Sequence, residues 1–367
     1  MIWMAIVVAG LALGVSALLY LAWYLRWETE QTAGMAYYGR SLAGRRALKQ
    51  RFRRLSAPVK PLVRLLAAAN RGRAAMPSFE FEGVSGPPKV SSPAVFDRAR
   101  RYQPRPEDVF VVTQMRCGTT WMQQLVYQIV TRGTGEFDDR GHRHLYAISP
   151  WIDAVNSVSI ERAPLVGARP TRIIKSHLPT RLCPYAAGAR YIYVTRHPVS
   201  CLASIVDYNR SLLGPLMPPV ESMANWFCSD RMYWLPWPVH VDGWWEWAAT
   251  RDNVLFVHFE EMKRDFASVR DRIERFLGCE LTASERERVG ERSSFKYMKE
   301  HEEFFEMAPP TMFSVEGGQF LASGRESRSE DVTPEIARQI RDYCRTSLAG
   351  RSYPLERFYP DLGADSR

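Results

Sequence analysis

Short apolar runs alternate with helical patterns from residue 108 onward. Four runs of strand length are rich in β-branched and aromatic residues, as strands buried on both faces are: 108–113, 172–175, 190–195 and 253–258. Between and after them, apolar residues recur at helical spacing over 119–130, 199–213, 266–277 and 333–348. Strands that alternate with helices predict an α/β fold of three layers, with helices on both faces of a central parallel sheet.

Residues at the ends of two predicted helices support these boundaries. Gly278 follows the helix 266–277, and glycine is the usual residue just past a helix C-terminus. Thr333 and Pro334 open the last helix as an N-cap and a first-turn proline. In open parallel sheets, ligands bind beyond the carboxyl ends of the strands, so the residues after each run are the first candidates for a site.

The N-terminus has a different pattern, because residues 2–25 contain no charged side chain. About 20 apolar residues suffice to cross a bilayer. Aromatic residues lie at both ends, as in interfacial belts: Trp3, then Tyr20, Trp23, Tyr24 and Trp27. We therefore expect one transmembrane anchor over 2–25. The alternative is a cleaved signal peptide, but a basic leading region is missing and the run exceeds the usual length of roughly 7–15 residues.

The chain carries a net charge of +9, and much of the positive charge follows the apolar segment. Arginines and lysines crowd 26–75, whereas nothing before the segment is basic. The positive-inside rule then predicts a single-pass protein with its bulk on the cytoplasmic side. The six cysteines form no C-x-x-C pair, which fits reduced thiols on that side and argues against a zinc site or a disulfide framework.

Residues 26–75 predict a basic juxtamembrane helical segment, which either lies on anionic lipid or forms a solvated stalk. No base-reading motif accompanies it, so we expect no nucleic-acid partner. Residues 76–107 are rich in Pro, Ser and Gly and are interpreted as a linker. The catalytic domain is expected over 108–362. The sequence does not indicate an oligomeric state.

The first strand of the domain ends in the sequence T-Q-M-R-C-G-T-T-W (113–121), which has the features of an anion site. Backbone N–H groups and the dipole at a helix N-terminus attract phosphate, and Gly118 allows close approach. Arg116 adds charge, and the two threonines add hydroxyl donors. The loop lacks the Gly-Lys pair of a Walker A motif, which argues against a magnesium-dependent nucleoside triphosphatase.

This loop resembles T-Y-P-K-S-G-T-T-W, the 5′-phosphosulfate loop of sulfotransferases that use 3′-phosphoadenosine-5′-phosphosulfate (PAPS). Arg116 and Cys117 replace the family's lysine and serine. Further segments resemble family motifs in the same order: R-I-I-K-S-H-L-P (172–179), the 3′-phosphate motif at 193–204, F-E-E-M-K (259–263) and S-S-F-K-Y-M (293–298). These segments cover nearly all of the domain.

The resemblance implies a P-loop-like domain that transfers a sulfuryl group in-line to a hydroxyl or amine, without a metal. His177 would be the general base, and Arg116 and Lys175 would stabilise the transferring group. The residues that would hold PAPS are Arg116, Cys117, Gly118, Thr119, Thr120, Trp121, Arg196, Ser204, Ser293, Phe295 and Arg325. Trp121 and Phe295 would sandwich the adenine, and Arg196 and Ser204 would bind the 3′-phosphate.

Two departures from the family keep other interpretations open. Phe259 replaces a tyrosine, and the last motif, R-K-G-x-x-G-x-W, survives only as a weak match at 323–330, which includes Arg325. The alternatives are a catalytically degenerate nucleotide-binding protein on a membrane and, less well supported, a nucleotide kinase. The acceptor is expected to be a small molecule, and the membrane segment favours a lipid-like one.

Overall fold

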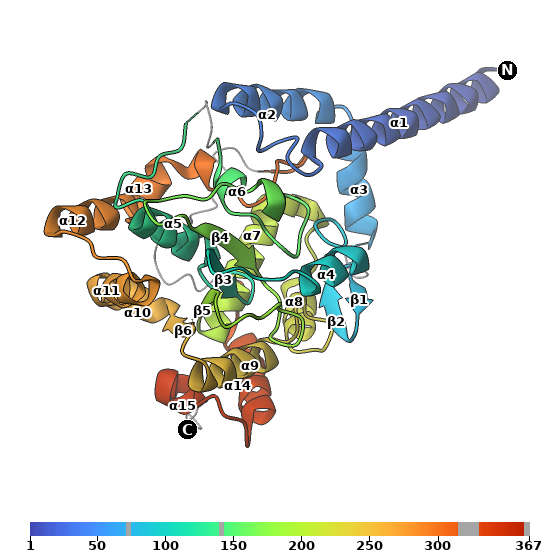
Figure 1. The fold of residues 1–367 in the computed structure, drawn as a ribbon. Coiled ribbons are helices and arrows are strands. Elements are labelled where there is room, and N and C mark those ends of the chain that lie inside the picture. The colour runs from blue at the N-terminus through green and yellow to red at the C-terminus, as the bar shows by residue number, and fades with distance from the viewer. Residues whose placement is uncertain (71–74, 139–142, 315–329, 363–367) are drawn as a thin grey trace.

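The computed structural model describes residues 1–70, 75–138, 143–314 and 330–362. Its central sheet has the order β4-β3-β5-β6, and all neighbouring strands are parallel. The strands are β3 (Asp108–Thr113), β4 (Arg172–Ser176), β5 (Arg190–Thr195) and β6 (Val254–His258). These are the four runs read from the sequence, so the predicted α/β class and the parallel sheet are confirmed (Figure 1).

Helices cover both faces of the sheet. This explains why successive residues of each strand, which point to opposite faces, are all mainly apolar. Val109 and Val111 pack on one face with α5 (Thr119–Val130), α11 (Phe266–Leu277) and α12 (Ala283–Arg292). Phe110 and Val112 belong to the core on the other face. The helices of that second face are α7 (Pro198–Leu213), α8 (Val220–Phe227), α9 (Trp237–Thr250) and α14 (Pro334–Leu348).

The predicted helix ends are also confirmed. Gly278 adopts a left-handed conformation with φ 67° directly after α11. The Thr333 hydroxyl accepts a hydrogen bond from the Ile336 backbone N–H, with Pro334 in the first turn of α14. Shorter helices complete this part of the domain: α6 (Leu145–Ile148), α10 (Phe259–Arg264), α13 (Phe295–Glu300) and α15 (Leu355–Phe358).

The stretch 76–107 differs from the expected linker, because it contains structure that is packed into the core. Strands β1 (Phe79–Phe81) and β2 (Val84–Gly86) form an antiparallel hairpin. Helix α4 (Pro93–Arg100) follows, and the Ser92 side chain caps it. Val84, Phe96 and Ala99 are fully buried in the core of the second face. The prolines and glycines here mark the turns between short elements.

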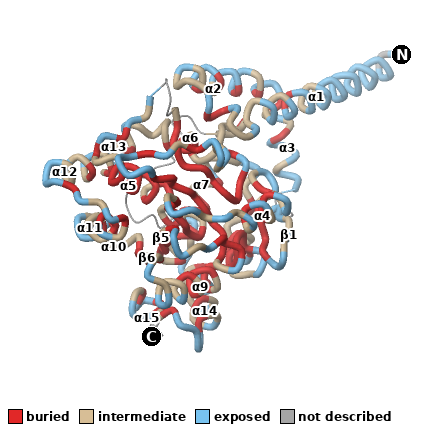
Figure 2. Tube along the Cα trace, in the orientation of Figure 1, coloured by how far each residue is buried: buried red, intermediate tan, exposed pale blue. Residues whose placement is uncertain are grey.

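The apolar N-terminus forms one long helix, α1 (Ile2–Thr32), which projects from the domain (Figure 1). Its first part is exposed along its length (Figure 2), and the helix is long and apolar enough to cross a membrane. Its last part is packed on the domain: Tyr24 is fully buried, and the Trp27 ring lies 5.0 Å from the Phe52 ring of α2 (Leu42–Ser56). Helix α1 therefore runs without a break from an exposed apolar span into the folded core.

The basic segment is bound to the domain through ion pairs and buried apolar residues. Arg45 is 1% exposed and donates hydrogen bonds to the Glu303 and Arg143 carbonyls, while Arg46 pairs with the Glu303 carboxylate at 2.6 Å. Lys49 pairs with Glu306. Leu48 and Phe52 of α2 and Val63 of α3 (Lys60–Asn70) are buried, whereas Leu65 and Leu66 of α3 are exposed. The apolar side of α2 therefore packs on protein.

Candidate active site

The candidate residues converge because the strands that carry them are parallel and in register. Thr113 of β3 pairs with Val194 of β5, and Val112 pairs with Ser176 of β4. His177 follows the end of β4, and Arg196 follows the end of β5. The loop that begins at Gln114 follows the end of β3. Parallel strands place all three at one edge of the sheet, where such folds bind ligands.

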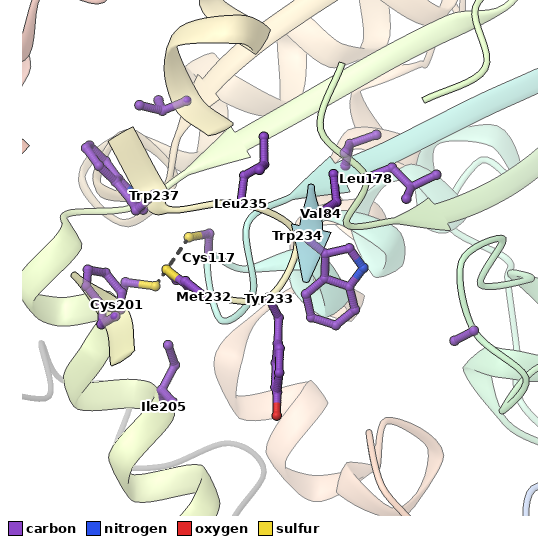
Figure 3. Packing of buried hydrophobic residues seen from close by; sticks show 14 of the residues in the cluster. Val84, Cys117, Leu178, Cys201, Ile205, Met232, Tyr233, Trp234, Leu235 and Trp237 are labelled. Atoms are coloured by element: carbon purple, nitrogen blue, oxygen red, sulfur yellow. Dashed lines mark hydrogen bonds between the residues drawn. The ribbon is translucent and has the colours of Figure 1, made fainter. Parts of the chain in front are cut away.

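The loop between β3 and α5 is held in a strained but well-supported shape. Arg116 and Gly118 both have positive φ angles, 64° and 101°. A Cβ atom on Gly118 would lie 2.7 Å from the Phe259 ring, so only glycine fits there without a shift. The Cys117 side chain is fully buried, and its Sγ lies 3.8 Å from the Cys201 Sγ (Figure 3). A ligand in the loop would therefore meet the backbone of Cys117 and not its thiol.

Two guanidinium groups lie beside this loop. The Nε of Arg116 donates to the Ser204 hydroxyl at 3.2 Å, and its guanidinium lies 4.8 Å from the centre of the Tyr208 ring. Arg196 donates to the Arg116 carbonyl at 3.3 Å and lies over the Phe259 ring. Burial lowers the pKa of Arg116, and Arg196 lowers it further. The structure thus joins Arg116, Arg196 and Ser204 in one positively charged corner that favours an anion.

His177 is nearly buried and is oriented by the end of β3. Its Nδ1 lies 2.8 Å from the Thr113 carbonyl oxygen. A carbonyl only accepts hydrogen bonds, so Nδ1 carries the proton and Nε2 keeps a free lone pair. The backbone N–H of His177 donates to the buried Asp153 carboxylate. Burial, together with the nearby Lys175 ammonium, holds the pKa of His177 well below its usual value. The ring is therefore neutral and able to accept a proton at Nε2.

Lys175 lies two residues before His177 and is 1% exposed. Its Nζ donates to the Tyr146 hydroxyl at 2.9 Å and lies 3.5 Å from the centre of the Trp151 ring. Burial lowers the pKa of Lys175 to about 7, against the attraction of Asp153. An anion placed beside this amine would favour its charged form.

The buried position of Lys175 predicts a specific dependence of stability on pH. Between a folded pKa of about 7 and the unfolded value of about 10.4, the unfolded chain binds a proton that the folded protein has released. Lys175 therefore makes the protein more stable as the pH rises through this range. The unfolding free energy of wild type minus that of Lys175→Met should increase from pH 7 to pH 9, measured by chemical denaturation in detergent. A flat or falling difference would contradict a lowered pKa of Lys175 in the folded protein.

Trp121, in the first turn of α5, contacts Ser293. The Trp121 Nε1 donates to the Ser293 carbonyl at 2.8 Å, and the Trp121 ring stacks on Phe266. Phe295 is 44% exposed at the start of α13. Within the described residues the Trp121 and Phe295 rings do not contact each other. Two rings with a base between them would likewise be apart. The adenine sandwich remains a prediction. Arg325 lies outside the described residues.

Two residues of the site, Asp153 and Trp151, were not predicted from the sequence. Asp153 supports His177, and the Trp151 and Trp234 rings lie 5.2 Å and 4.8 Å from the His177 ring and 6.1 Å from each other. Trp234 and Leu235 both have positive φ angles, 59° and 78°, and the Gln114 side chain bonds to the Tyr233 and Leu235 carbonyls. Two consecutive left-handed residues are costly and recur at functional sites. No local pattern in the sequence marks them.

Comparisons with known proteins identify relatives of this chain. Rabbit (Oryctolagus cuniculus) sulfotransferase 1C2 is 28% identical over 231 residues, which cover 60% of this chain and 75% of the relative. A 3-alpha-hydroxysteroid sulfotransferase from Cavia porcellus is 28% identical over 249 residues, covering 66% and 84%.

Solved structures share the fold. Mouse sulfotransferase SULT7A1 in complex with PAP matches with a TM-score of 0.59 and 20% identity, covering 78% of this chain and 98% of that one. A retinol dehydratase in complex with androsterone and PAP matches with a TM-score of 0.54, also at 20% identity, covering 79% and 96%. The family model described as the sulfotransferase domain matches residues 106–352. With its fold, its ordered motifs and this match over most of its length, the chain belongs to the sulfotransferase family.

Proposed function

We propose that this chain transfers a sulfuryl group from PAPS to a hydroxyl group of a membrane-soluble acceptor. The observation that carries the proposal is the convergence of Arg116, Arg196, Lys175 and His177 at one edge of the sheet, in the order of the family motifs. The solved relatives named above hold PAP, the desulfated product of PAPS, which supports PAPS as the donor.

The residues fit a donor with two phosphate ends and an adenine. Among the described residues, three buried polar atoms near the loop have no hydrogen-bond partner: Arg196 Nε, Thr120 Oγ1 and Ser293 Oγ. Buried polar groups are rarely left unpaired, so these atoms favour a bound polar ligand. Arg196 and Ser204 would hold the 3′-phosphate, the loop 116–120 the 5′-phosphate, and Trp121 with Ser293 and Phe295 the adenine.

PAPS would supply the group that is transferred, and the protein's side chains would supply the base and the positive charge. PAPS supplies a sulfur atom whose bond to a phosphate oxygen breaks as a new bond to the acceptor oxygen forms. His177 takes the acceptor's hydroxyl proton at Nε2. Arg116 and Lys175 hold negative charge that develops on the phosphate and sulfuryl oxygens, and such fixed charge is typically the largest contribution to rate. The Trp151 and Trp234 rings exclude water from one side of His177.

The N-terminal helix supports the membrane part of the proposal. Its apolar side chains from Trp3 to Leu19 are largely exposed, which is costly in water and favourable in lipid. The charge-free span precedes a strongly basic segment, so we propose a single-pass protein whose catalytic domain faces the cytoplasm. If this orientation holds, a protease added to the outside of intact cells should leave the catalytic domain uncut.

The proposal is tested with the full chain in detergent micelles. Adenosine 3′,5′-bisphosphate (PAP) and ATP with magnesium are titrated separately by calorimetry, and transfer of ³⁵S from PAPS to a panel of alcohols is then measured. We expect binding of PAP in strong preference to ATP with magnesium, followed by labelled product. A folded protein that does not bind PAP would contradict the proposal and favour the degenerate alternative. Preference for ATP with magnesium would favour a kinase.

A further inference from the structure

The segment that follows the membrane helix reaches the catalytic centre. Tyr38 lies six residues after the last residue of α1 and is fully buried. Its ring lies 4.3 Å from the His144 ring and 5.1 Å from the Tyr146 ring. Tyr146 in turn accepts the hydrogen bond from Lys175 Nζ. One aromatic ring therefore separates the membrane-proximal segment from the amine that is proposed to hold the sulfuryl group.

The Tyr38 hydroxyl is buried, and it is left without a hydrogen-bond partner inside the described part of the protein. A buried hydroxyl without a partner costs free energy, which a polar atom of a bound molecule would recover. Burial raises the pKa of Tyr38 well above its usual value, and the nearby hydroxyls of Tyr146 and Tyr208 raise it further. Tyr38 is therefore a neutral hydrogen-bond donor near the site.

The segment that carries Tyr38 is held firmly in place. The hydroxyl of the preceding Tyr37 donates to the Glu306 carboxylate at 2.5 Å. The Gly39 carbonyl accepts a hydrogen bond from Arg143 at 2.7 Å, and the Arg40 guanidinium donates to Gln31 at the end of α1. A side chain fixed from both sides is preorganised for recognition, because little conformational freedom is lost on binding.

The chemistry around Tyr38 indicates what such a ligand is. The rings of His144 and Tyr146 contact the Tyr38 ring, and among the described residues no carboxylate forms a hydrogen bond with its hydroxyl, although the Glu306 charge lies near. Beyond Tyr146, the Trp151 ring extends the aromatic wall to His177. Such a wall suits an uncharged molecule that is mostly apolar and carries hydroxyl or other polar groups at its ends. The exposed apolar span of α1 ends in the same packed unit, at Tyr24 and Trp27. Molecules dissolved in a bilayer around α1 meet the domain at this end.

We propose that Tyr38 is an acceptor-binding residue, and that the site which it completes takes an uncharged, membrane-soluble alcohol. The inference rests on the proposed function and adds to it that the acceptor is uncharged and that a residue outside the matched domain selects it. The residue belongs to the segment that follows α1, which lies outside the matched sulfotransferase domain at 106–352.

The test uses the full chain in phospholipid nanodiscs with ³⁵S-labelled PAPS. The acceptors are a 3-hydroxysterol and a long-chain primary alcohol dissolved in the nanodisc, with water-soluble 2-naphthol as comparison. We expect wild type to prefer at least one of the membrane alcohols. Tyr38→Phe should raise the KM for that alcohol about fivefold to tenfold, the effect of one lost hydrogen bond, with little change in kcat. The KM for 2-naphthol, which needs only His177 and Lys175, should not change.

The control is Tyr20→Phe, which removes another hydroxyl of the same region, one that donates to the Leu55 carbonyl far from the site. It should leave every kinetic constant unchanged, and both variants should bind PAP like wild type. An unchanged KM in Tyr38→Phe, or equal use of 2-naphthol and the membrane alcohols, would overturn the inference. Intact PAP binding without transfer to either membrane alcohol would also overturn it. Loss of PAP binding in wild type would instead overturn the proposed function.

Discussion

Replacement of His177 by asparagine should lower kcat about 10²–10⁴-fold while the Kd for PAP stays within about twofold of wild type. The asparagine amide can still donate to the Thr113 carbonyl, as Nδ1 does in the wild type. It has no basic nitrogen in the place of Nε2, so the acceptor proton has no recipient. Calorimetry with PAP and single-turnover transfer of ³⁵S separate these two expectations.

The control for this variant is His301→Asn, since the His301 ring contacts Tyr297 of α13, with a hydrogen bond to its carbonyl and a stacked ring. That change should leave kcat unaltered. The wild type should also lose activity in acid only well below pH 6.5, because burial favours the neutral form of His177. Full activity in His177→Asn, or a loss equal to the loss of PAP binding, would contradict a general base at this position.

Replacement of Arg196 by alanine should weaken PAP binding about 100-fold, the effect of losing a charged hydrogen-bond partner worth about 3 kcal/mol. The loss should be confined to the 3′-phosphate. Wild type should bind PAP much more tightly than adenosine 5′-monophosphate, and the variant should bind the two nearly alike. The unpaired Nε of Arg196 and its position over the Phe259 ring place the guanidinium for this contact.

Arg210→Ala is the matched control, because Arg210 lies on α7 near its far end and pairs there with Asp331. Its effect on PAP binding should be less than about twofold, as expected of an exposed ion pair. If Arg196→Ala weakened binding of the monophosphate as much as that of PAP, Arg196 would support the loop through the Arg116 carbonyl and would not recognise the 3′-phosphate.

The sequence predicted the parts of the molecule that depend on local patterns. Each strand of the sheet is a compact apolar run, and Arg116, His177 and Arg196 each follow a strand end within a few positions. Strands that alternate with helices along the chain form a parallel sheet, and their carboxyl ends lie at one edge. The proximity of Arg116, His177 and Arg196 follows from this. Caps such as Thr333 and stops such as Gly278 are equally local.

The rest depends on contacts between distant residues. Tyr37 and Glu306 are 269 positions apart, so no window of sequence shows that the segment after α1 packs on the domain. The hairpin and helix within 76–107 are short, and their prolines and glycines have the composition of a linker. Asp153 and Trp234 act on His177 only through tertiary packing. Their residue types are as common in cores and loops as in sites.

The docking of α1 has a consequence for how the protein would encounter its acceptor. A catalytic domain on a flexible tether samples the aqueous volume around its anchor. Here Tyr24 lies in the folded core and Trp27 packs against it, which holds the domain to the helix. With α1 in a bilayer, the search becomes lateral diffusion within a surface. Turnover would then follow the mole fraction of the acceptor among the lipids, and dilution of that surface with inert phospholipid would slow the reaction at constant total concentration.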